Sequence, residues 1–347
     1  MKKIKWGVIG CGGIADRRTL PGMMLADNAE LVAVMDVNPD FANACKEKYG
    51  AKYAFTNEAD LLAIDEIEAV YIASPVFCHK PQVFAAAAAK KHILCEKPLG
   101  LTIEESEEIV AECKKQGVKL GAGLMMRYHG YHQAMKALVA EKKLGQIVSM
   151  RGQLTCWYPE IPGNWRQDKA RSGGGAGMDM AIHCIDLLQY ISGAKAVEVA
   201  AFAGNQTFNY TADDFSNILI KMDDGSVMYV DANFNIPDAA ARGRLEIYGT
   251  RGSVLAEGTI GQVEGGKVEV VLSNDTLGYD AAQDRVDVEA VELEAKLGNM
   301  YTKEIEGFGN AILNDTVPPV SGDDALQVQK VVEAAYTSAK TGKNQTL

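Results

Sequence analysis

The sequence lacks the marks of a membrane, secreted or metal-binding protein. No apolar run among its 347 residues is long enough to span a bilayer, and the opening MKKIKWGVIG enters a strand pattern without the apolar core of a signal peptide. The seven cysteines are scattered and form no Cys-x-x-Cys pair, which disfavours a disulfide framework or a zinc site. We therefore expect a cytoplasmic protein with reduced thiols, no membrane partner and no metal.

Positive charge is also in short supply. There are 35 Lys and Arg against 46 Asp and Glu, a net charge of −11 that repels phosphate backbones, so nucleic acid is not expected as a partner. The remaining composition is ordinary for a globular protein, with 47% hydrophobic and 23% charged residues. A chain of this length is too long for one comfortable core, which predicts two domains, residues 1–125 and 126–347.

The first 125 residues alternate strand and helix patterns with short gaps. The helical pattern 102–116 opens with Thr-Ile-Glu-Glu, a capping box in which Thr102 is the N-cap. Apolar strands that alternate with helices are typical of a Rossmann-type, doubly wound parallel sheet, an α/β fold. The strand-like runs lie at residues 4–9, 31–35, 69–73, 93–95 and 119–124.

The alternation of strand and helix patterns ends at about residue 125. From Ala196 onward strands dominate, and turn sequences at 223–226 and 249–252 each predict a hairpin. This pattern predicts an α+β domain with a large, mostly antiparallel open sheet. The expected elements are helix 129–143, strand 147–157, loop 158–175, a helix from near Gly177, strand pairs 215–222 with 227–236 and 245–248 with 253–256, and a final helix, 323–340, near the junction.

A glycine-rich turn directly follows the first strand. Residues 7–15 read GVIGCGGIA, which places Gly10-x-Gly12-x-x-Ala15 between a strand and a helix. Gly10 permits the tight turn, Gly12 lets the backbone approach a pyrophosphate, and the small Ala15 allows the helix to pack on the strand. Gly13 and Ile14 complete the loop, and the amides of the helix start favour negative charge. A purely structural turn is the alternative, but the flanking strand and helix favour a dinucleotide site.

An acid in the expected place favours NAD as the cofactor. Asp36 ends the second strand, 21 residues beyond Ala15, where a carboxylate would hydrogen-bond the adenosine ribose hydroxyls. The same carboxylate would repel a 2′-phosphate, so NAD is favoured over NADP. A nearby cation can reverse that preference, and Arg17 and Arg18 lie close in sequence, so NADP stays open.

Two further strand ends should meet the glycine loop, because parallel sheets bind ligands outside the carboxyl ends of their strands. Ser74 and Pro75 follow one apolar strand, and Glu96 and Lys97 follow the next, so both pairs should face the same crevice. Lys97 is thereby placed beside the expected nicotinamide end. A lysine that simply extends from a strand terminus is the alternative. His79 is expected either near the nicotinamide or in a helix-cap or surface role.

The stretch 173–193, GGGAGMDMAIHCIDLLQYISG, carries three polar residues at helical spacing. Asp179 and His183 are four apart, and Asp186 follows three later, so on a helix all three share one face. A carboxylate and an imidazole that face one way can orient a hydroxyl and take its proton. The alternative is a partly buried histidine that is satisfied by its own helix neighbour.

The loop before this helix suggests a carbohydrate substrate. Trp157 and Trp165 lie eight residues apart, and apolar faces of sugar rings stack well on such side chains. Arg166, Arg127 and Tyr128 offer hydrogen bonds to hydroxyls. A cyclic polyol or a pyranose would suit this set, whereas packing of the tryptophans under their own loop is the alternative.

Taken together, these motifs resemble the Gfo/Idh/MocA oxidoreductases, which include glucose-fructose oxidoreductase and inositol dehydrogenase. The resemblance rests on the glycine loop, Glu96-Lys97-Pro98 and Asp179-x-x-x-His183-x-x-Asp186, and it covers nearly the full chain. Ala15 and Ala181 stand where the family often has glycine, and both substitutions are small. Further motifs in the expected order are Ala73-Ser74-Pro75 with His79, Met126-Arg127-Tyr128, Asn164-Trp165-Arg166 and Gly249-Thr250-Arg251-Gly252.

The resemblance implies an NAD(P)-dependent dehydrogenase that acts on a secondary alcohol of a sugar or cyclic polyol. Lys97, Asp179 and His183 would form the catalytic group. His183 would be the general base, Lys97 would stabilise the same oxygen, and Asp179 would orient the substrate or the lysine. The roles of Lys97 and His183 could be exchanged.

Two other functions are open to members of such a family: an NAD-using glycosidase, and a non-enzymatic sensor that binds nucleotide or sugar. The intact catalytic group counts against the sensor. The resemblance also implies pairing through the open face of the C-terminal sheet, so we expect a homodimer or homotetramer. Strand 229–236 places Asp231, Asn233 and Asn235 on one face, which is either solvated or part of such a contact.

Overall fold

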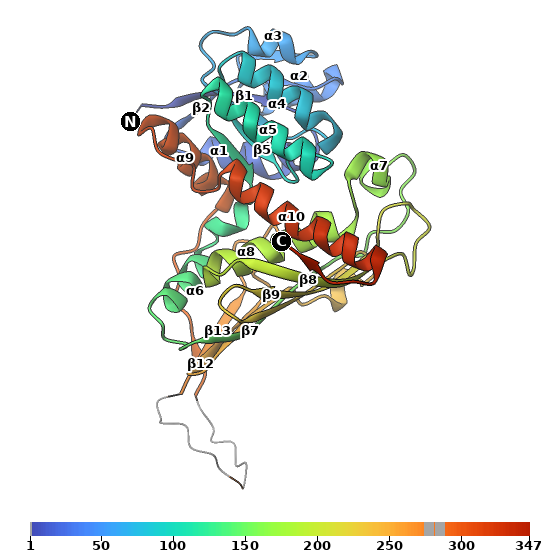
Figure 1. Cartoon of the computed structure of the whole chain (residues 1–347). Coiled ribbons are helices and arrows are strands. Elements are labelled where there is room, and N and C mark those ends of the chain that lie inside the picture. Colours follow the sequence, from blue (N-terminus) through green and yellow to red (C-terminus); the bar gives the residue numbers. More distant parts are fainter. Residues whose placement is uncertain (1, 274–280, 282–288) are drawn as a thin grey trace.

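Two β-sheets organise the chain in the computed structural model, which describes residues 2–273, 281 and 289–347 (Figure 1). Within these residues the N-terminal sheet has six strands, all parallel to their neighbours. The C-terminal sheet has nine described strands and is mostly antiparallel. The expected fold class, a Rossmann α/β domain followed by an α+β domain with a large open sheet, is confirmed.

The N-terminal sheet has the strand order β3-β2-β1-β4-β5-β6 of a dinucleotide-binding fold. Its central strands are buried on both faces because helices cover both sides of a parallel sheet, as is seen for Val8 and Ile9 of β1, which are both buried and point to opposite faces. The chain order reverses between β1 and β4, and ligands bind at such a reversal. The elements are β1 Ile4–Ile9, α1 Leu20–Leu25, β2 Ala29–Met35, α2 Pro39–Tyr49, β3 Tyr53–Phe55, α3 Glu58–Leu62, β4 Ala69–Ile72, α4 His79–Ala88, β5 His92–Glu96, α5 Ile103–Gln116 and β6 Leu120–Gly123.

The C-terminal sheet has the order β14-β13-β12-β11-β7-β10-β9-β8-β15. Both expected hairpins are confirmed, since β9 pairs with β10 and β11 pairs with β12, antiparallel in each case. Its one parallel pairing among the described strands joins β7 to β10. The elements are α6 Gly130–Ala140, β7 Ile147–Thr155, α7 Lys169–Ser172, α8 Ile182–Ser192, β8 Ala196–Gly204, β9 Phe215–Met222, β10 Val227–Asn233, β11 Arg244–Gly249, β12 Gly252–Glu257, β13 Lys267–Leu272, β14 Val291–Glu292, α9 Met300–Leu313, α10 Gly322–Thr341 and β15 Gln345–Thr346.

Within the part of the chain that the structure describes, helices cover only one face of this sheet. Helix α8 packs on β7, and α10 packs on β8 and also contacts α5 and β6 of the Rossmann domain. Figure 1 shows α10 running along the boundary between the two domains. The final helix therefore lies at the junction, where the sequence places it. A search of the described residues finds no helix with the length and apolarity needed to cross a membrane.

Helix α9 lies in a region where we expected strands to dominate. Asn299 caps it, because its side chain accepts the Thr302 N–H at 3.0 Å. The buried side chains of Ile305 and Phe308 belong to the core of the N-terminal domain, and the ring centroids of Phe308 and Trp6 are 5.7 Å apart. The C-terminal part of the chain thus returns to complete the packing of the Rossmann sheet.

Local details differ from the expectations in three places. The expected loop 158–175 contains a 3₁₀ turn, Trp165–Gln167, and the short helix α7. The helix expected from Gly177 begins with a π-helical segment, Gly177–Ala181, before α8. Thr102 does cap α5 by accepting the Glu105 N–H at 3.2 Å, but the Glu105 carboxylate accepts from Leu101 instead of closing the box on Thr102.

Candidate active site

The carboxyl ends of the Rossmann strands open onto a cavity of about 720 Å³ that reaches the C-terminal domain. Its walls come from the glycine loop, the ends of β4 and β5, the end of β7 and the segment that leads into α8. The size suits part of a dinucleotide together with a small substrate. The sequence-predicted site residues that line it are Gly13, Ile14, Ser74, His79, Glu96, Lys97, Trp165, Arg166, Asp179 and His183.

The glycine loop leaves room for a pyrophosphate. Gly10 has a φ of +94°, and a Cβ there would lie 2.8 Å from the Ser74 backbone nitrogen, so only glycine fits. A Cβ on Gly12 would meet nothing within 4 Å, which means that the backbone here faces open space. The Ala15 N–H donates to the Gly12 carbonyl at 3.0 Å and begins the helical turn. These residues fit a dinucleotide, whose phosphates the loop amides would hold.

Asp36 lies next to this loop and is held by backbone amides. Its two carboxylate oxygens accept the N–H groups of Cys11 at 2.8 Å and Asn38 at 2.9 Å. The two arginines that could have reversed its effect lie elsewhere. Arg17 lines the cavity, and Arg18 donates its Nε–H to the Gln262 side chain at 3.0 Å. Among the described residues, neither arginine forms an ion pair with Asp36.

His79 joins the two strand-end loops. Its Nδ1 lies 2.9 Å from the Pro98 carbonyl oxygen, and its Nε2 lies 2.9 Å from the Ser74 carbonyl oxygen. The side chain is buried, and burial lowers the pKa of the imidazole. Pro75 lies in the same loop but does not line the cavity. His79 therefore lies between the backbone at Ser74 and the backbone beside Lys97, and its neutral imidazole, which carries one N–H, can donate to one of these two carbonyls at a time.

The strand that ends in Glu96 and Lys97 delivers one carboxylate and one cation to the cavity. Burial raises the pKa of Glu96, whose Oε1 accepts the Tyr71 hydroxyl at 2.6 Å. The Lys97 side chain is only 12% exposed, and its Nζ donates to the Asp179 carboxylate at 2.7 Å and to the Asp179 carbonyl at 2.9 Å. A lysine has three N–H donors, so one is left for a ligand oxygen.

The electrostatics of Asp179 and His183 follow from Lys97. Burial would raise the pKa of the Asp179 carboxyl, but the cations of Lys97 and Arg166 outweigh it and hold that pKa below its usual range. Burial and the Lys97 cation together lower the pKa of His183 to about 3. His183 is therefore neutral at physiological pH. Its Nδ1 is buried with no hydrogen-bond partner among the described residues, which leaves Nε2 as the ring nitrogen open to the cavity.

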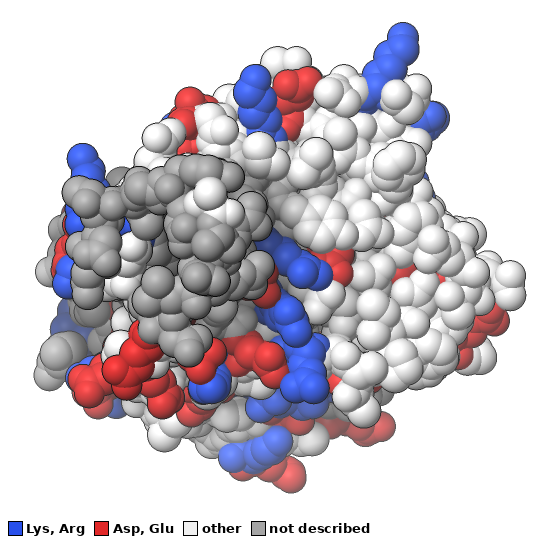
Figure 2. Space-filling model, turned by 90° about the horizontal axis from the view of Figure 1, so that it is seen from below, with Lys and Arg blue, Asp and Glu red and all other residues white. Residues whose placement is uncertain are grey.

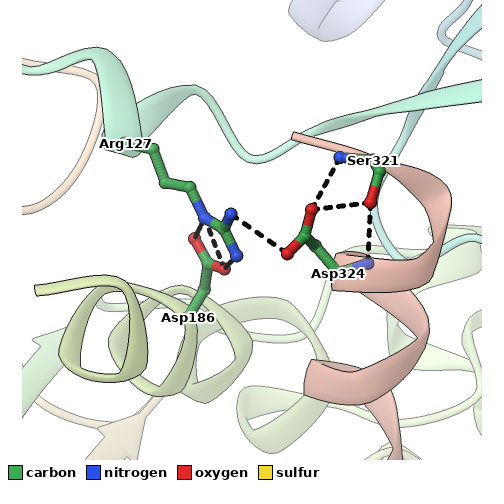
Figure 3. Close-up of polar contacts among 4 residues, drawn as sticks. All are labelled: Arg127, Asp186, Ser321 and Asp324. Carbon is green, nitrogen blue, oxygen red and sulfur yellow. Dashed lines mark hydrogen bonds and ion pairs between the residues drawn. The ribbon is translucent and has the colours of Figure 1, made fainter. Parts of the chain in front are cut away.

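Asp186 does not share the cavity with Asp179 and His183, although helical spacing predicts a common face. Asp179 in the π-helical segment and His183 on α8 both line the cavity, so the departure is at Asp186 alone, three residues beyond His183 on the same helix. Asp186 is 1% exposed and accepts from Arg127 at 2.6 to 3.1 Å, and Arg127 also lies 3.4 Å from Asp324 at the start of α10. Figure 3 shows this ion-pair group with the Ser321 cap of α10.

Three of the predicted substrate-binding residues lie outside the cavity lining: Arg127, Tyr128 and Trp157. Arg127 is engaged with the two carboxylates just described, so its position does not support the expected substrate contact. Tyr128 is buried beside α9. Trp157 is 43% exposed, and its ring packs edge-on against Phe208 at a centroid distance of 5.2 Å. Phe208 belongs to the loop between β8 and β9, so Trp157 contacts a different loop from its own.

Trp165 and Arg166 do reach the cavity. The Arg166 guanidinium lies over the Trp165 ring at 4.4 Å, which holds a cation beside Asp179 and Glu96. The lining residues that sequence reasoning missed include Tyr158, Asp238 and Gln262. Tyr158 directly follows an expected strand and could have been found from that position. The other two have no local signal, because only the tertiary fold brings their loops to the cavity.

The folds of the two domains and the cavity that both of them line indicate the class of protein. A parallel Rossmann sheet with a glycine loop, joined to a mostly antiparallel sheet across one cavity, is the architecture of a two-domain, nucleotide-dependent oxidoreductase. Residues 4–124 match the model of an oxidoreductase family with an NAD-binding Rossmann fold, and residues 132–255 match the GFO/IDH/MocA C-terminal domain. The chain belongs to the Gfo/Idh/MocA oxidoreductase family, and its N-terminal domain is an NAD(P)-binding domain.

Individual relatives cover nearly the whole chain. It is 25% identical over 340 residues to 1,5-anhydro-D-fructose reductase of Ensifer adhaerens, covering 98% of this chain and 97% of the relative. It is 28% identical over 336 residues to myo-inositol 2-dehydrogenase of Thermotoga maritima, covering 96% and 95%. Its fold is similar to that of levoglucosan dehydrogenase in complex with NADH and levoglucosan, with a TM-score of 0.88, 24% identity and 99% coverage of both chains.

Proposed function

We propose that this protein is an NAD-dependent dehydrogenase that oxidises a secondary alcohol of a sugar or cyclic polyol. The observation that carries the proposal is the group formed by Lys97, Asp179 and His183, which meet in one cavity directly beside the glycine loop. Relatives of nearly full length that act on inositol and anhydrofructose support the substrate class.

The side chains divide the proton chemistry among them. Asp179 holds two donors of Lys97, and the third would bind the substrate oxygen and stabilise negative charge that develops on it. Neutral His183 would accept the hydroxyl proton at Nε2. A base of low pKa suffices here, because the hydroxyl becomes strongly acidic as hydride leaves its carbon. Bound nicotinamide supplies the hydride acceptor, and the residues at the ends of β4 and β5 would orient it.

The direct test is the near-ultraviolet absorbance of reduced nicotinamide. The protein would be mixed with NAD, and separately with NADP, against myo-inositol, D-glucose, D-xylose, levoglucosan and 4-nitrophenyl glycosides. Sustained reduction with one polyol or sugar is the expected result. Release of nitrophenol without net NADH would instead assign the glycosidase reaction, in which NAD is regenerated in every turnover. Binding of NAD without either reaction would support the sensor.

The pH dependence of kcat/KM should lack the acid limb of an ordinary histidine. The free-enzyme pKa of His183 is lowered to about 3, so the basic form persists as the pH falls. We expect His183 to cause no loss of kcat/KM between pH 8 and about pH 5.5, whereas a histidine of pKa about 6.5 would lose roughly tenfold. Initial rates with NAD across that range measure this. If kcat/KM of the wild type instead falls with a midpoint near pH 6.5, and this fall is absent in His183→Asn, then His183 does not have the lowered pKa.

Asp36 should decide the choice between NAD and NADP. Wild-type protein is expected to have a kcat/KM for NAD at least about tenfold above that for NADP, because the fixed carboxylate repels a 2′-phosphate. Asp36→Asn should narrow that ratio by about tenfold. Asp40→Asn, an exposed acid one turn into α2, is the matched control and should leave the ratio unchanged. If both variants narrow the ratio of kcat/KM for NAD to that for NADP equally, the preference is due to the net charge of the protein and not to Asp36.

The open face of the C-terminal sheet is proposed as the contact between subunits. Exposed Phe202, Leu219, Tyr229 and Tyr248 lie on this face, and Figure 2 shows a broad uncharged area beside a strip of Lys and Arg. Asp231, which we expected to be solvated or in a wet contact, is already buried against Gln153 in the single chain. Light scattering should give a dimer or tetramer, and Leu219→Glu should shift it to monomer. If light scattering shows only monomer for the wild-type protein at micromolar concentration, the proposed subunit contact is wrong.

A further inference from the structure

The segment that carries Asp179 is held at its start by two residues from distant elements. Asp213 precedes β9, and Tyr336 lies on α10. Neither residue lines the main cavity. Both contact the run of glycines that leads into the π-helical segment.

Asp213 accepts three consecutive backbone amides. Its two carboxylate oxygens accept the N–H groups of Gly175 at 2.6 Å and Gly177 at 2.8 Å, and its backbone carbonyl accepts the Ala176 N–H at 2.9 Å. Tyr336 completes the set, because its hydroxyl oxygen accepts the Met178 N–H at 2.9 Å. The same hydroxyl donates to Asp213 at 2.8 Å. Four consecutive amides that a helix start leaves unsatisfied are thus bound by two residues, three of them by side-chain oxygens and one by the Asp213 carbonyl.

The glycines of this stretch are required by that arrangement. A Cβ on Gly174 would overlap the Tyr336 hydroxyl, and a Cβ on Gly175 would overlap the Asp213 carbonyl. A Cβ on Gly177 would lie 2.7 Å from the Tyr336 hydroxyl oxygen. The glycine run therefore lets Asp213 and Tyr336 approach the backbone closely, which a simple flexible loop would not require.

We propose that Asp213 and Tyr336 are positioning residues that set the place of Asp179, and through it the place of Lys97. This inference rests on the proposed function, because it assigns the pair to the same reaction. The path is continuous: Asp213 binds the Gly175 N–H, the Gly175 carbonyl accepts the Asp179 N–H at 2.8 Å, and Asp179 binds Lys97 twice. A shift of the helix start would therefore move the atoms that hold the lysine.

Tyr336→Phe tests this role, since it removes one hydroxyl and keeps the ring that packs against the glycines. We expect kcat with NAD and the best compound of the panel above to fall about tenfold, with the Kd for NAD unchanged within about twofold. Hydrogen exchange of the peptide 175–181 should accelerate about tenfold, while exchange in β9 stays unchanged. Tyr336→Phe loses the two hydrogen bonds of its hydroxyl, to Met178 and Asp213. Tyr229→Phe, which loses a tyrosine hydroxyl that bonds Asn217 away from this segment, is the control and should show neither change.

A double-mutant cycle separates positioning from general stability. If Tyr336 acts through Asp179, then Tyr336→Phe should lower the residual turnover of Asp179→Asn by less than about twofold. The proposal would be overturned if Tyr336→Phe lowers kcat tenfold both in the wild type and in Asp179→Asn. It would also be overturned if Tyr336→Phe leaves the hydrogen exchange of the 175–181 peptide unchanged. Asp213→Asn provides a second, stronger variant, because an amide cannot accept both N–H groups. It should accelerate the same exchange further, and failure to do so would also overturn the proposal.

The exchange readout needs no substrate. If the wild-type protein reduces NAD with no compound of the panel, the proposed function fails, while the exchange of peptide 175–181 still decides whether the pair holds the Asp179 segment.

Discussion

Replacing Lys97 with methionine should lower kcat about 10³-fold while the Kd for NAD changes by no more than about twofold. The expected size reflects the loss of a charged donor at the reacting oxygen together with a misplaced acid–base group. Lys97 is the first of the two cations that hold the pKa of Asp179 low, so its removal should raise that pKa and leave the partly exposed Asp179 carboxylate without its ion-pair partner. Single-turnover NADH formation and calorimetric NAD binding measure the two quantities.

Lys119→Met is the matched control for this experiment. Lys119 is similarly buried, at 17% side-chain exposure, and forms an ion pair with Asp315 at 2.8 Å, but it lies outside the cavity lining. The Lys119→Met protein should therefore retain the kcat of the wild type. A Lys97→Met protein that keeps more than about a tenth of wild-type kcat would show that Lys97 is a strand-end lysine without a role in the chemistry. A parallel loss of NAD affinity would assign it to cofactor binding instead.

The parts of the molecule that the sequence predicts best depend on short-range patterns. Alternating apolar strands and helices predict the Rossmann sheet, because parallel strands buried on both faces have a recognisable composition. The rule that ligands bind at the carboxyl ends of such strands brings Ser74 and Lys97 to the cavity from positions 23 residues apart. The Asp179 and His183 spacing also places both residues at the cavity.

What could not be predicted depends on distant packing. The three-residue spacing of His183 and Asp186 suggests that both side chains lie on one face of the helix. Asp186 instead forms an ion pair with Arg127 at the junction of the two domains. Gln262 reaches the cavity, and its partner Arg18 is 244 residues away in the chain. At the π-helical start of the Asp179 segment, the Asp213 carboxylate accepts two backbone N–H groups from residues 38 and 36 positions away in the chain. No periodicity in the sequence encodes these contacts, because each joins elements whose relative placement the whole fold determines.

Arg127→Met should lower the free energy of unfolding by about 3–5 kcal/mol, the usual cost of leaving one partner of a buried ion pair uncompensated. Asp186 is 1% exposed and has no other cation bonded to it in the described residues, and Asp324 also loses a partner. Burial would lower the pKa of Arg127, but the two carboxylates outweigh it and raise that pKa, which indicates a tightly held charge. Urea denaturation followed by circular dichroism measures the loss.

Arg242→Met is the control, because Arg242 and Glu257 form an exposed pair, at 66% and 48% side-chain exposure, whose loss should cost less than about 1 kcal/mol. The double variant Arg127→Met, Asp186→Leu should be more stable than Arg127→Met alone, since it removes the orphaned charge as well. These results would assign Arg127 to the junction between the Rossmann domain, α8 and α10. An Arg127→Met protein of wild-type stability with a raised KM for the sugar would restore the substrate-binding role that the sequence suggested.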